Sequence, residues 1–219
     1  MKPHHVIWDW NGTLVDDAWL CVEIVNELLT RRELAPTTPC KYSEVFGFPL
    51  RTYYQRVGFD LQCEDFATLG DEFNLLYSQR LRECRLRKGA RGVLDALDRN
   101  GIGQSLLSAS NEVDLEEMVA HYGLRSHFAS VAGVDNGLGK GKIERGHRHL
   151  AALNCRGDEV LLIGDTLHDI EVAAALGVHC VLLPSGHQSR RRLELGECAV
   201  VDGLFAVAAL LGLKGDIHD

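Results

Sequence analysis

The chain has 219 residues, which fits one large domain or a domain that carries a sizeable insertion. Hydrophobic residues make up 46% and charged residues 25%, and 23 Lys and Arg against 31 Asp and Glu give a formal net charge of −8, which argues against a broad nucleic-acid-binding surface. No apolar run approaches the roughly 18 residues of a membrane span, and no signal-peptide layout precedes Asp9, so we expect a cytoplasmic protein. The seven cysteines include no C-x-x-C pair, and we expect their thiols to be reduced.

The first predicted element is a strand over residues 5–9, which stops at an Asn-Gly turn dipeptide. The segment that follows, residues 16–85, is expected to contain only helices, because apolar residues recur there at helical spacing, as at Leu20, Ile24 and Leu28. An all-helical block after the first strand of a sheet predicts a small cap domain over the strand ends, where open α/β sheets bind ligands.

From residue 89 to residue 211, predicted strands alternate with predicted helices. This alternation implies parallel strands joined by crossover helices, and hence an α/β fold with a doubly wound, Rossmann-like sheet. We therefore predict a discontinuous core over residues 1–15 and 86–219 and a helical cap over residues 16–85. The expected strands after the first cover residues 102–108, 129–133, 159–164, 179–184 and 198–201.

Three acidic side chains follow predicted strands: Asp9 after the first, and Asp165 and Asp169 after a later one. The ends of parallel strands meet at one edge of the sheet, so these carboxylates are expected to converge. Packed carboxylates repel one another unless a cation neutralises them, and hard oxygen ligands suit Mg²⁺. Lys142 or Lys140, near the start of the preceding helix, would add one more positive charge. The formal charges then cancel, so a phosphate dianion can enter without meeting net negative charge.

Ser108 closes the second predicted strand of the core and precedes a helix. Its hydroxyl and the backbone N–H groups of Ala109 and Ser110 are a candidate phosphate cradle. On local sequence alone, the same residues also fit a simple helix cap.

The motif Asp9-Trp-Asn-Gly-Thr-Leu-Val-Asp16 resembles the opening motif of the haloacid-dehalogenase-like hydrolase superfamily. Ser108, Lys142 and the run from Gly164-Asp165 to Asp169 match its second, third and fourth motifs in order and spacing. The resemblance covers nearly the whole chain. The helical insertion is similar to the cap that phosphoglycolate-phosphatase-like members place between their first two motifs.

This resemblance implies a phosphatase that forms an aspartyl-phosphate on Asp9, which water then hydrolyses. Asp9, the backbone carbonyl of Asn11 and Asp165 would hold Mg²⁺, and Asp169 would support that site through water or through its neighbours. Ser108 and Lys142 would bind the phosphoryl oxygens. The resemblance also places Gly12, Thr13 and Ala109 among the phosphate-binding positions.

One position departs from the family pattern. Phosphatases of the superfamily usually carry a second Asp two residues after the nucleophile, as general acid and base, and here that residue is Asn11. An amide cannot shuttle a proton, so we expect a preference for substrates with good leaving groups unless His168 supplies the proton. Dehalogenase members also lack this Asp, but they lack the metal site too, so Asp165 and Asp169 argue against dehalogenation.

The cap contains one candidate for substrate recognition, Arg51, in a segment that we expect to face the site. The expected partner is a small phosphorylated metabolite whose identity the sequence does not specify, and we expect a monomer or weak homodimer. A second hypothesis stays open, in which the chain is a catalytically weak member that binds a phosphorylated ligand or regulates a partner.

Overall fold

The computed structural model describes residues 3–134, 141–153 and 155–213. Within these residues, one sheet of parallel strands has the order β5-β4-β1-β6-β7-β8. The first strand therefore lies in the middle of the sheet, where the strand order reverses, which confirms the predicted doubly wound α/β fold. The strands are β1 (His5–Trp8), β4 (Gly103–Asn111), β5 (Val131–Val134), β6 (Val160–Gly164), β7 (His179–Leu182) and β8 (Ala199–Val200).

Helices cover both faces of the sheet, and alternate residues of β1 belong to different buried clusters. Ile7 packs with residues of α7 and α8, whereas Val6 and Trp8 pack with residues of α5, α6 and α10. Strands β1 and β6, whose residues are all buried, are therefore covered on both faces, as the nearly continuous apolar run at residues 160–163 predicts. The helices are α5 (Ala90–Arg99), α6 (Glu112–His121), α7 (Lys142–Leu153), α8 (Leu167–Leu176), α9 (Arg190–Leu193) and α10 (Leu204–Leu210).

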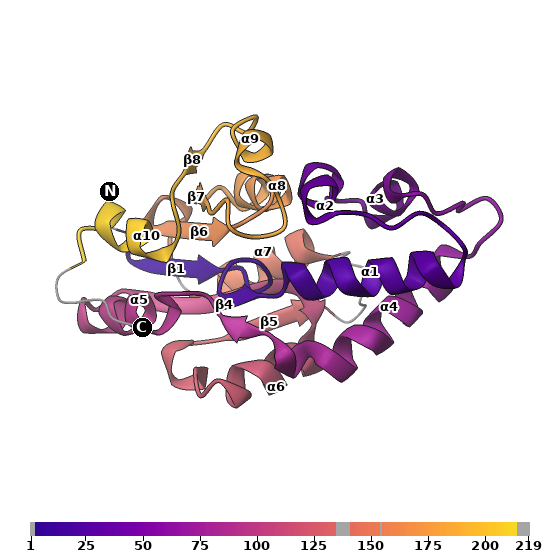
Figure 1. Cartoon of the computed structure of the whole chain (residues 1–219). Coiled ribbons are helices and arrows are strands. Elements are labelled where there is room, and N and C mark those ends of the chain that lie inside the picture. The colour runs from indigo at the N-terminus through magenta and orange to yellow at the C-terminus, as the bar shows by residue number, and fades with distance from the viewer. Residues whose placement is uncertain (1–2, 135–140, 154, 214–219) are drawn as a thin grey trace.

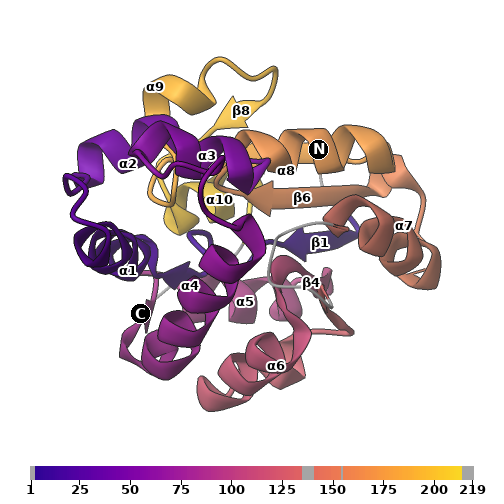
Figure 2. The same cartoon turned by 90° about the vertical axis from the view of Figure 1, so that its right-hand side faces the viewer.

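The insertion after β1 folds into helices that lie beyond the carboxyl ends of the strands. The arrowheads of β1 and β6 point towards these helices in Figure 1, and the insertion lies in front of the sheet in Figure 2. Leu20, Ile24 and Leu28 are fully buried, as their spacing predicts. Nothing in the described ranges is a helix long and apolar enough to cross a membrane. The four helices are α1 (Ala18–Arg31), α2 (Pro39–Val45), α3 (Leu50–Val57) and α4 (Phe66–Arg80).

Two short strands pair where the chain leaves the core and where it returns. Strand β2 (Val15–Asp16) is antiparallel to β3 (Arg85–Leu86). The observed junction lies beside the predicted boundaries of the cap at residues 16 and 85, and the division into two domains stays a prediction. The described residues also form short 3-10 helices, η1 (Leu81–Glu83), η2 (Arg125–His127) and η3 (Gly157–Glu159).

Strand β4 differs from the expectation that it ends at Ser108. It continues to Asn111, with an irregular register against β5 after Leu107. The helix cap is Asn111, whose side chain accepts hydrogen bonds from the backbone N–H groups of Val113 and Asp114, at 2.9 and 3.4 Å. The helix-cap alternative for Ser108 is therefore wrong.

Candidate active site

Three buried carboxylates meet at the carboxyl edge of the sheet. Asp9 follows β1, Asp165 follows β6, and Asp169 lies in the first turn of α8. Each offers an oxygen atom that lies within 4.8 Å of the oxygens of the other two. The parallel sheet thus brings together the acidic residues of the first and fourth motifs.

Lys142, at the first position of α7, lies between two of these carboxylates. Its Nζ donates hydrogen bonds to Asp9 Oδ1 at 2.6 Å and to Asp169 Oδ1 at 2.7 Å, and the residue is 3% exposed. Burial opposes the charged ammonium, but the two carboxylates outweigh it and raise the pKa of Lys142. The rival candidate Lys140 lies outside the described residues.

The three carboxylates are not equally neutralised. Burial raises the pKa of Asp9 to about 6, even though Lys142 acts in the opposite direction. Burial likewise raises the pKa of Asp165 to about 7. For Asp169, by contrast, Lys142 and the hydrogen bonds from Thr166 overcome burial and hold the pKa below its usual value. The positive charges near Asp9 and Asp165 therefore do not offset the effect of burial on these two carboxylates.

One oxygen atom of Asp165 has no partner among the described residues. This atom, Oδ1, is buried and accepts no hydrogen bond from them, whereas Oδ2 accepts one from the backbone N–H of His187. The backbone of Gly12 and Gly186 packs so closely on this carboxyl that a Cβ atom at either position would overlap Oδ2, and Gly12 also has φ +72°. The unpaired oxygen is buried, and it belongs to a carboxyl group whose pKa is raised. Such an oxygen is a suitable ligand for a hard divalent cation such as Mg²⁺.

The side chain of Asn11 is committed to other side chains. Its Nδ2 donates hydrogen bonds to Asp17 Oδ2 and to the Tyr77 hydroxyl, both at 2.7 Å. Its Oδ1 accepts hydrogen bonds from the hydroxyl of Ser110 and, at 3.5 Å, from that of Ser108. The side-chain amide of Asn11 thus links β4 to α4 and to the N-cap of α1. None of these contacts involves the backbone carbonyl of Asn11.

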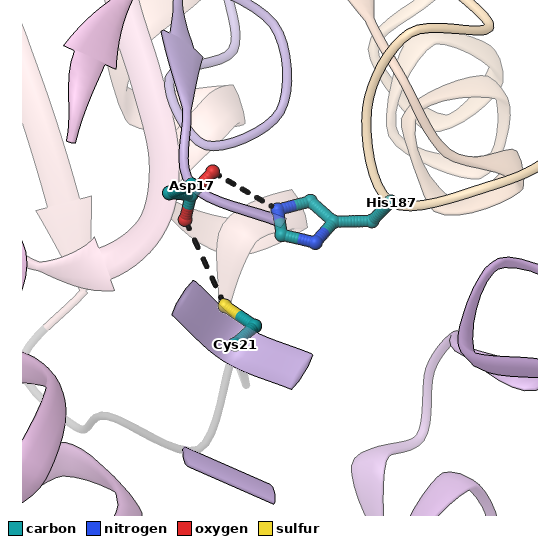
Figure 3. Close-up of side chains that lie close together, drawn as sticks. All are labelled: Asp17, Cys21 and His187. Atoms are coloured by element: carbon teal, nitrogen blue, oxygen red, sulfur yellow. Dashed lines mark hydrogen bonds and ion pairs between the residues drawn. The ribbon is translucent and has the colours of Figure 1, made fainter. Parts of the chain in front are cut away.

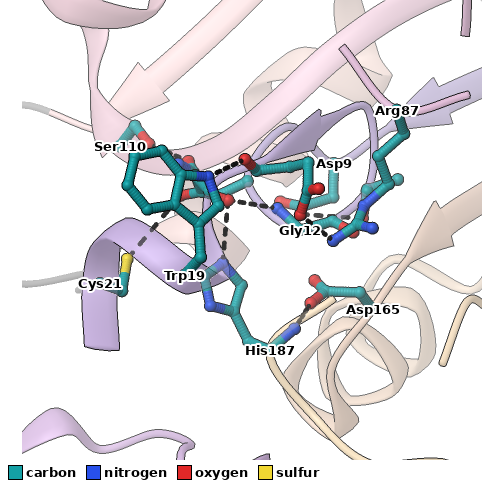
Figure 4. Close-up of polar contacts among 12 residues, drawn as sticks. Asp9, Gly12, Trp19, Cys21, Arg87, Ser110, Asp165 and His187 are labelled. Atoms are coloured by element: carbon teal, nitrogen blue, oxygen red, sulfur yellow. Dashed lines mark hydrogen bonds and ion pairs between the residues drawn. The ribbon is translucent and has the colours of Figure 1, made fainter. Parts of the chain in front are cut away.

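A second buried cluster, which no sequence motif indicated, lies beside Asn11. Asp17, the N-cap residue of α1, accepts a hydrogen bond from the backbone N–H of Gly12 at 2.8 Å and lies 3.3 Å from His187 Nε2. His187 Nδ1 lies 2.7 Å from the Tyr42 hydroxyl, and the Cys21 thiol donates to Asp17 at 3.8 Å. Figure 3 shows the side chains of Asp17, Cys21 and His187, and Figure 4 shows His187 next to Asp165 and Gly12.

Asp17 and His187 form a buried ion pair. Burial alone would raise the pKa of Asp17 and lower that of His187, but their mutual attraction outweighs it. The pKa of Asp17 is lowered to about 2, and that of His187 is raised to about 9. No motif points to His187, which lies in the loop after β7. The sequence could have indicated it only by its position after a predicted strand, because that strand also ends at the carboxyl edge of the sheet.

The predicted phosphate-binding residues surround Asp9. Thr13 Oγ1 donates a hydrogen bond to Asp9 Oδ2 at 3.1 Å, and Ser108 is buried in the lining of a cavity that also reaches Asp9. The backbone N–H of Ser110 already donates to Ser108 Oγ at 3.1 Å, so it has an acceptor within the last residues of β4. The predicted site residues that gather here are Asp9, Asn11, Gly12, Thr13, Ser108, Ala109, Lys142, Asp165 and Asp169.

The cavity has a volume of about 540 Å³ and lies between the carboxyl edge of the sheet and the inserted helices. Arg51 is not among its described lining residues: it is exposed on α3, with its guanidinium 4.9 Å from the ring centre of Phe66. The expectation that Arg51 faces the site is therefore wrong, because α3 turns this residue outwards. His168 does line the cavity, with its Nδ1 2.7 Å from Glu171 Oε2.

A family model of haloacid dehalogenase-like hydrolases matches residues 6–183. The chain belongs to the haloacid dehalogenase-like hydrolase family. This assignment agrees with the order and spacing of the four motifs, and the relatives of this hydrolase support the phosphoglycolate-phosphatase-like branch.

Two curated relatives have different activities in their names. The phosphoglycolate phosphatase of Agrobacterium fabrum is 26% identical over 214 residues, which cover 94% of this chain and 91% of the relative. The tyrosine-protein kinase PtkA of Mycobacterium tuberculosis is 23% identical over 195 residues and 85% of this chain, and the match spans only 64% of its length. Among solved structures, a predicted phosphatase from Clostridium acetobutylicum superimposes with a TM-score of 0.80 at 20% identity, covering 97% of this chain and 100% of that protein. This last similarity concerns the fold.

Proposed function

We propose that this hydrolase cleaves a small phosphomonoester in a Mg²⁺-dependent reaction through an aspartyl-phosphate on Asp9. The observation that carries the proposal is the buried Asp165 oxygen without a partner, beside the Asp9–Lys142–Asp169 cluster. Asp9, the Asn11 carbonyl and Asp165 would hold the metal, and Asp169 would support it. Bound Mg²⁺ would draw electron density from the phosphoryl oxygens and neutralise the carboxylates.

The residues of the chain have distinct roles in this proposal. Lys142 and Thr13 orient the Asp9 carboxylate through its two oxygens, so that one lone pair can attack phosphorus. The new bond joins phosphorus to an Asp9 oxygen while the bond to the leaving oxygen breaks, and water later releases phosphate and restores Asp9. Ser108, the Ala109 backbone and Lys142 would bind the phosphoryl oxygens.

Asn11 limits which substrates react quickly. Both donor positions of its amide are used by Asp17 and Tyr77, and an amide does not release a proton to a leaving group. General acid–base assistance is typically worth about 10²–10⁴-fold, so esters of acidic alcohols and acyl phosphates should react fastest. His168 lines the same cavity and is the alternative proton donor.

The test is phosphate release from acetyl phosphate, with and without Mg²⁺. We expect metal-dependent turnover that is lost in Asp9→Asn and kept in the control Asp71→Asn, whose residue is exposed on α4. The commitment of Asn11 to a structural hydrogen-bond network favours a second candidate, a catalytically weak protein that binds a phosphorylated ligand. Binding of a phosphorylated ligand without turnover above background in the wild-type protein would select that candidate.

A further inference from the structure

We infer that the substrate is an aryl phosphate: a phosphomonoester whose leaving group is aromatic and carries no second anionic group. This inference rests on the proposed function and adds the class of substrate. Four features of the cavity carry it: its aromatic lining, the pairing of its cations, its apolar mouth and the amide at position 11.

The inserted helices contribute mainly apolar and aromatic side chains to the cavity. One wall comes from α3 and the segment that precedes it. The ring centroids of Phe46 and of Tyr53 on α3 are 5.1 Å apart, and those of Phe46 and Phe48 are 6.1 Å apart. Phe73 and Tyr77 of α4 add a stacked pair at 6.0 Å. Aromatic walls of this kind favour a flat, apolar ligand, which gains both burial and ring contacts.

The cations in the described part of the lining are already paired. Lys142 is the one Lys or Arg there, and it contacts Asp9 and Asp169. His187 is paired with Asp17, as described above. A carboxylate or second phosphate on the substrate would therefore find no unpaired cation among these residues, and would lose hydration without compensation. The cavity thus disfavours phosphoglycolate, although a phosphoglycolate phosphatase is among the relatives.

The mouth of the cavity is also apolar. Leu75 on α4 is 60% exposed and Val113 on α6 is 73% exposed, and both line the cavity. A single exposed apolar residue needs no explanation, but two that border one aromatic cavity form a surface that an apolar ligand would cover.

The chemistry at position 11 points in the same direction. When the bond between phosphorus and an aryl oxygen breaks, the electron pair stays on that oxygen as a stabilised aryl oxide, which takes its proton from water afterwards. Asp9 forms the new bond to phosphorus, so atoms and charges balance without a protein proton donor. The Asn11 amide, which cannot donate a proton in this way, is therefore adequate for an aryl phosphate.

Two phosphonates test the class of ligand without depending on turnover. Benzylphosphonate resembles phenyl phosphate, whereas phosphonopropionate resembles phosphoglycolate; neither is hydrolysed, so leaving-group acidity does not enter. We expect calorimetry on the Mg²⁺-loaded protein to give at least about tenfold tighter binding of benzylphosphonate, the gain expected from burying one phenyl ring.

A matched pair of variants places the binding in this cavity. Leu75→Lys adds a cation at the mouth and should reduce the preference for benzylphosphonate several-fold, whereas Leu195→Lys, at a residue that is 78% exposed and outside the described lining, should leave it unchanged. Equal or tighter binding of phosphonopropionate to the wild-type protein, or equal effects of the two variants, would overturn the inference.

Hydrolysis of acetyl phosphate separates this inference from the proposed function. Acetyl phosphate has a good leaving group but no ring, so it reports on catalysis alone. Turnover that needs Mg²⁺ and Asp9, combined with no preference for benzylphosphonate, would overturn the aryl assignment and leave the phosphatase proposal standing. Absence of that turnover would overturn both.

Discussion

Replacing Asn11 by Asp should destabilise the protein in a strongly pH-dependent manner. In the wild-type protein, Asn11 Nδ2 donates a hydrogen bond to Asp17 Oδ2 at 2.7 Å, and Asp17 is fully buried. Asn11→Asp replaces this donor by a carboxylate oxygen. Two carboxylates at that separation repel by about 6 kcal/mol at an effective dielectric constant of 20.

The pair can avoid this repulsion by sharing one proton. Holding a proton on a carboxyl whose ordinary pKa is about 4 costs about 4 kcal/mol at pH 7, which sets the upper limit of the destabilisation. Between pH 4 and pH 7 the folded variant would bind one more proton than the unfolded chain, so its stability should recover by about 1.4 kcal/mol for each pH unit of acidification. Once protonated, the introduced carboxyl could also serve as a proton donor, and turnover of alkyl phosphates by the folded protein should rise by at least about tenfold.

The measurement is urea unfolding of the wild-type protein and of Asn11→Asp at pH 5, 6 and 7. Asn11→Leu is the control, because it removes the hydrogen bonds without adding a charge and its cost should not change with pH. In the double variant, Asp17→Asn supplies a new donor to the introduced carboxylate and should recover at least half of the loss at pH 7. A cost in Asn11→Asp that is the same at pH 5 and pH 7 would refute the contact with Asp17.

Further predictions concern the carboxylates, two buried histidines and Arg51. Asp9→Asn should abolish Mg²⁺-dependent turnover without lowering the melting temperature, because it removes a buried carboxyl whose pKa is raised to about 6. Asp165→Asn should stabilise the metal-free protein above pH 7, since the pKa of Asp165 is raised to about 7, and should weaken the thermal stabilisation that Mg²⁺ produces. Burial lowers the pKa of His5 and of His149 to about 4. The stability that their neutral forms provide is therefore present above pH 6.5 and is lost as the pH falls towards 4, by about 3 kcal/mol or less for each histidine. His149→Gln should flatten this dependence in urea unfolding. Arg51→Ala should leave the relative kcat/KM values of aryl and alkyl phosphates unchanged, and a changed ratio would place Arg51 at the site after all.

The fold was predictable because its signals are local and repetitive. Apolar runs followed by helical spacing predicted the parallel sheet, and the first strand's position before a helical block predicted the insertion. The convergence of Asp9, Asp165 and Asp169 followed from the same topology, since residues after parallel strands must meet at one edge. Lys142 was harder to identify, because Lys140 also lies near the start of the same predicted helix.

Other features depend on three-dimensional packing that no local pattern specifies. The outward direction of Arg51 depends on how α3 rotates against Phe66, and a single polar residue on a short helix does not determine that rotation. His187 contacts Asp17 from a loop that is far away in the sequence. No local pattern around either residue could therefore predict their ion pair. The end of β4 at Asn111 was missed because Ser108 and Asn111 are both good cap residues.

The most direct test of the account is detection of the aspartyl-phosphate itself. Wild-type protein mixed with naphthyl phosphate and Mg²⁺ is quenched in acid within one turnover, and its peptides are analysed by mass spectrometry. The account predicts phosphate on the peptide that contains Asp9, absent without Mg²⁺ and absent in Asp9→Asn. Burst release of naphthol with no phosphorylated peptide, or continued turnover by Asp9→Asn, would contradict it.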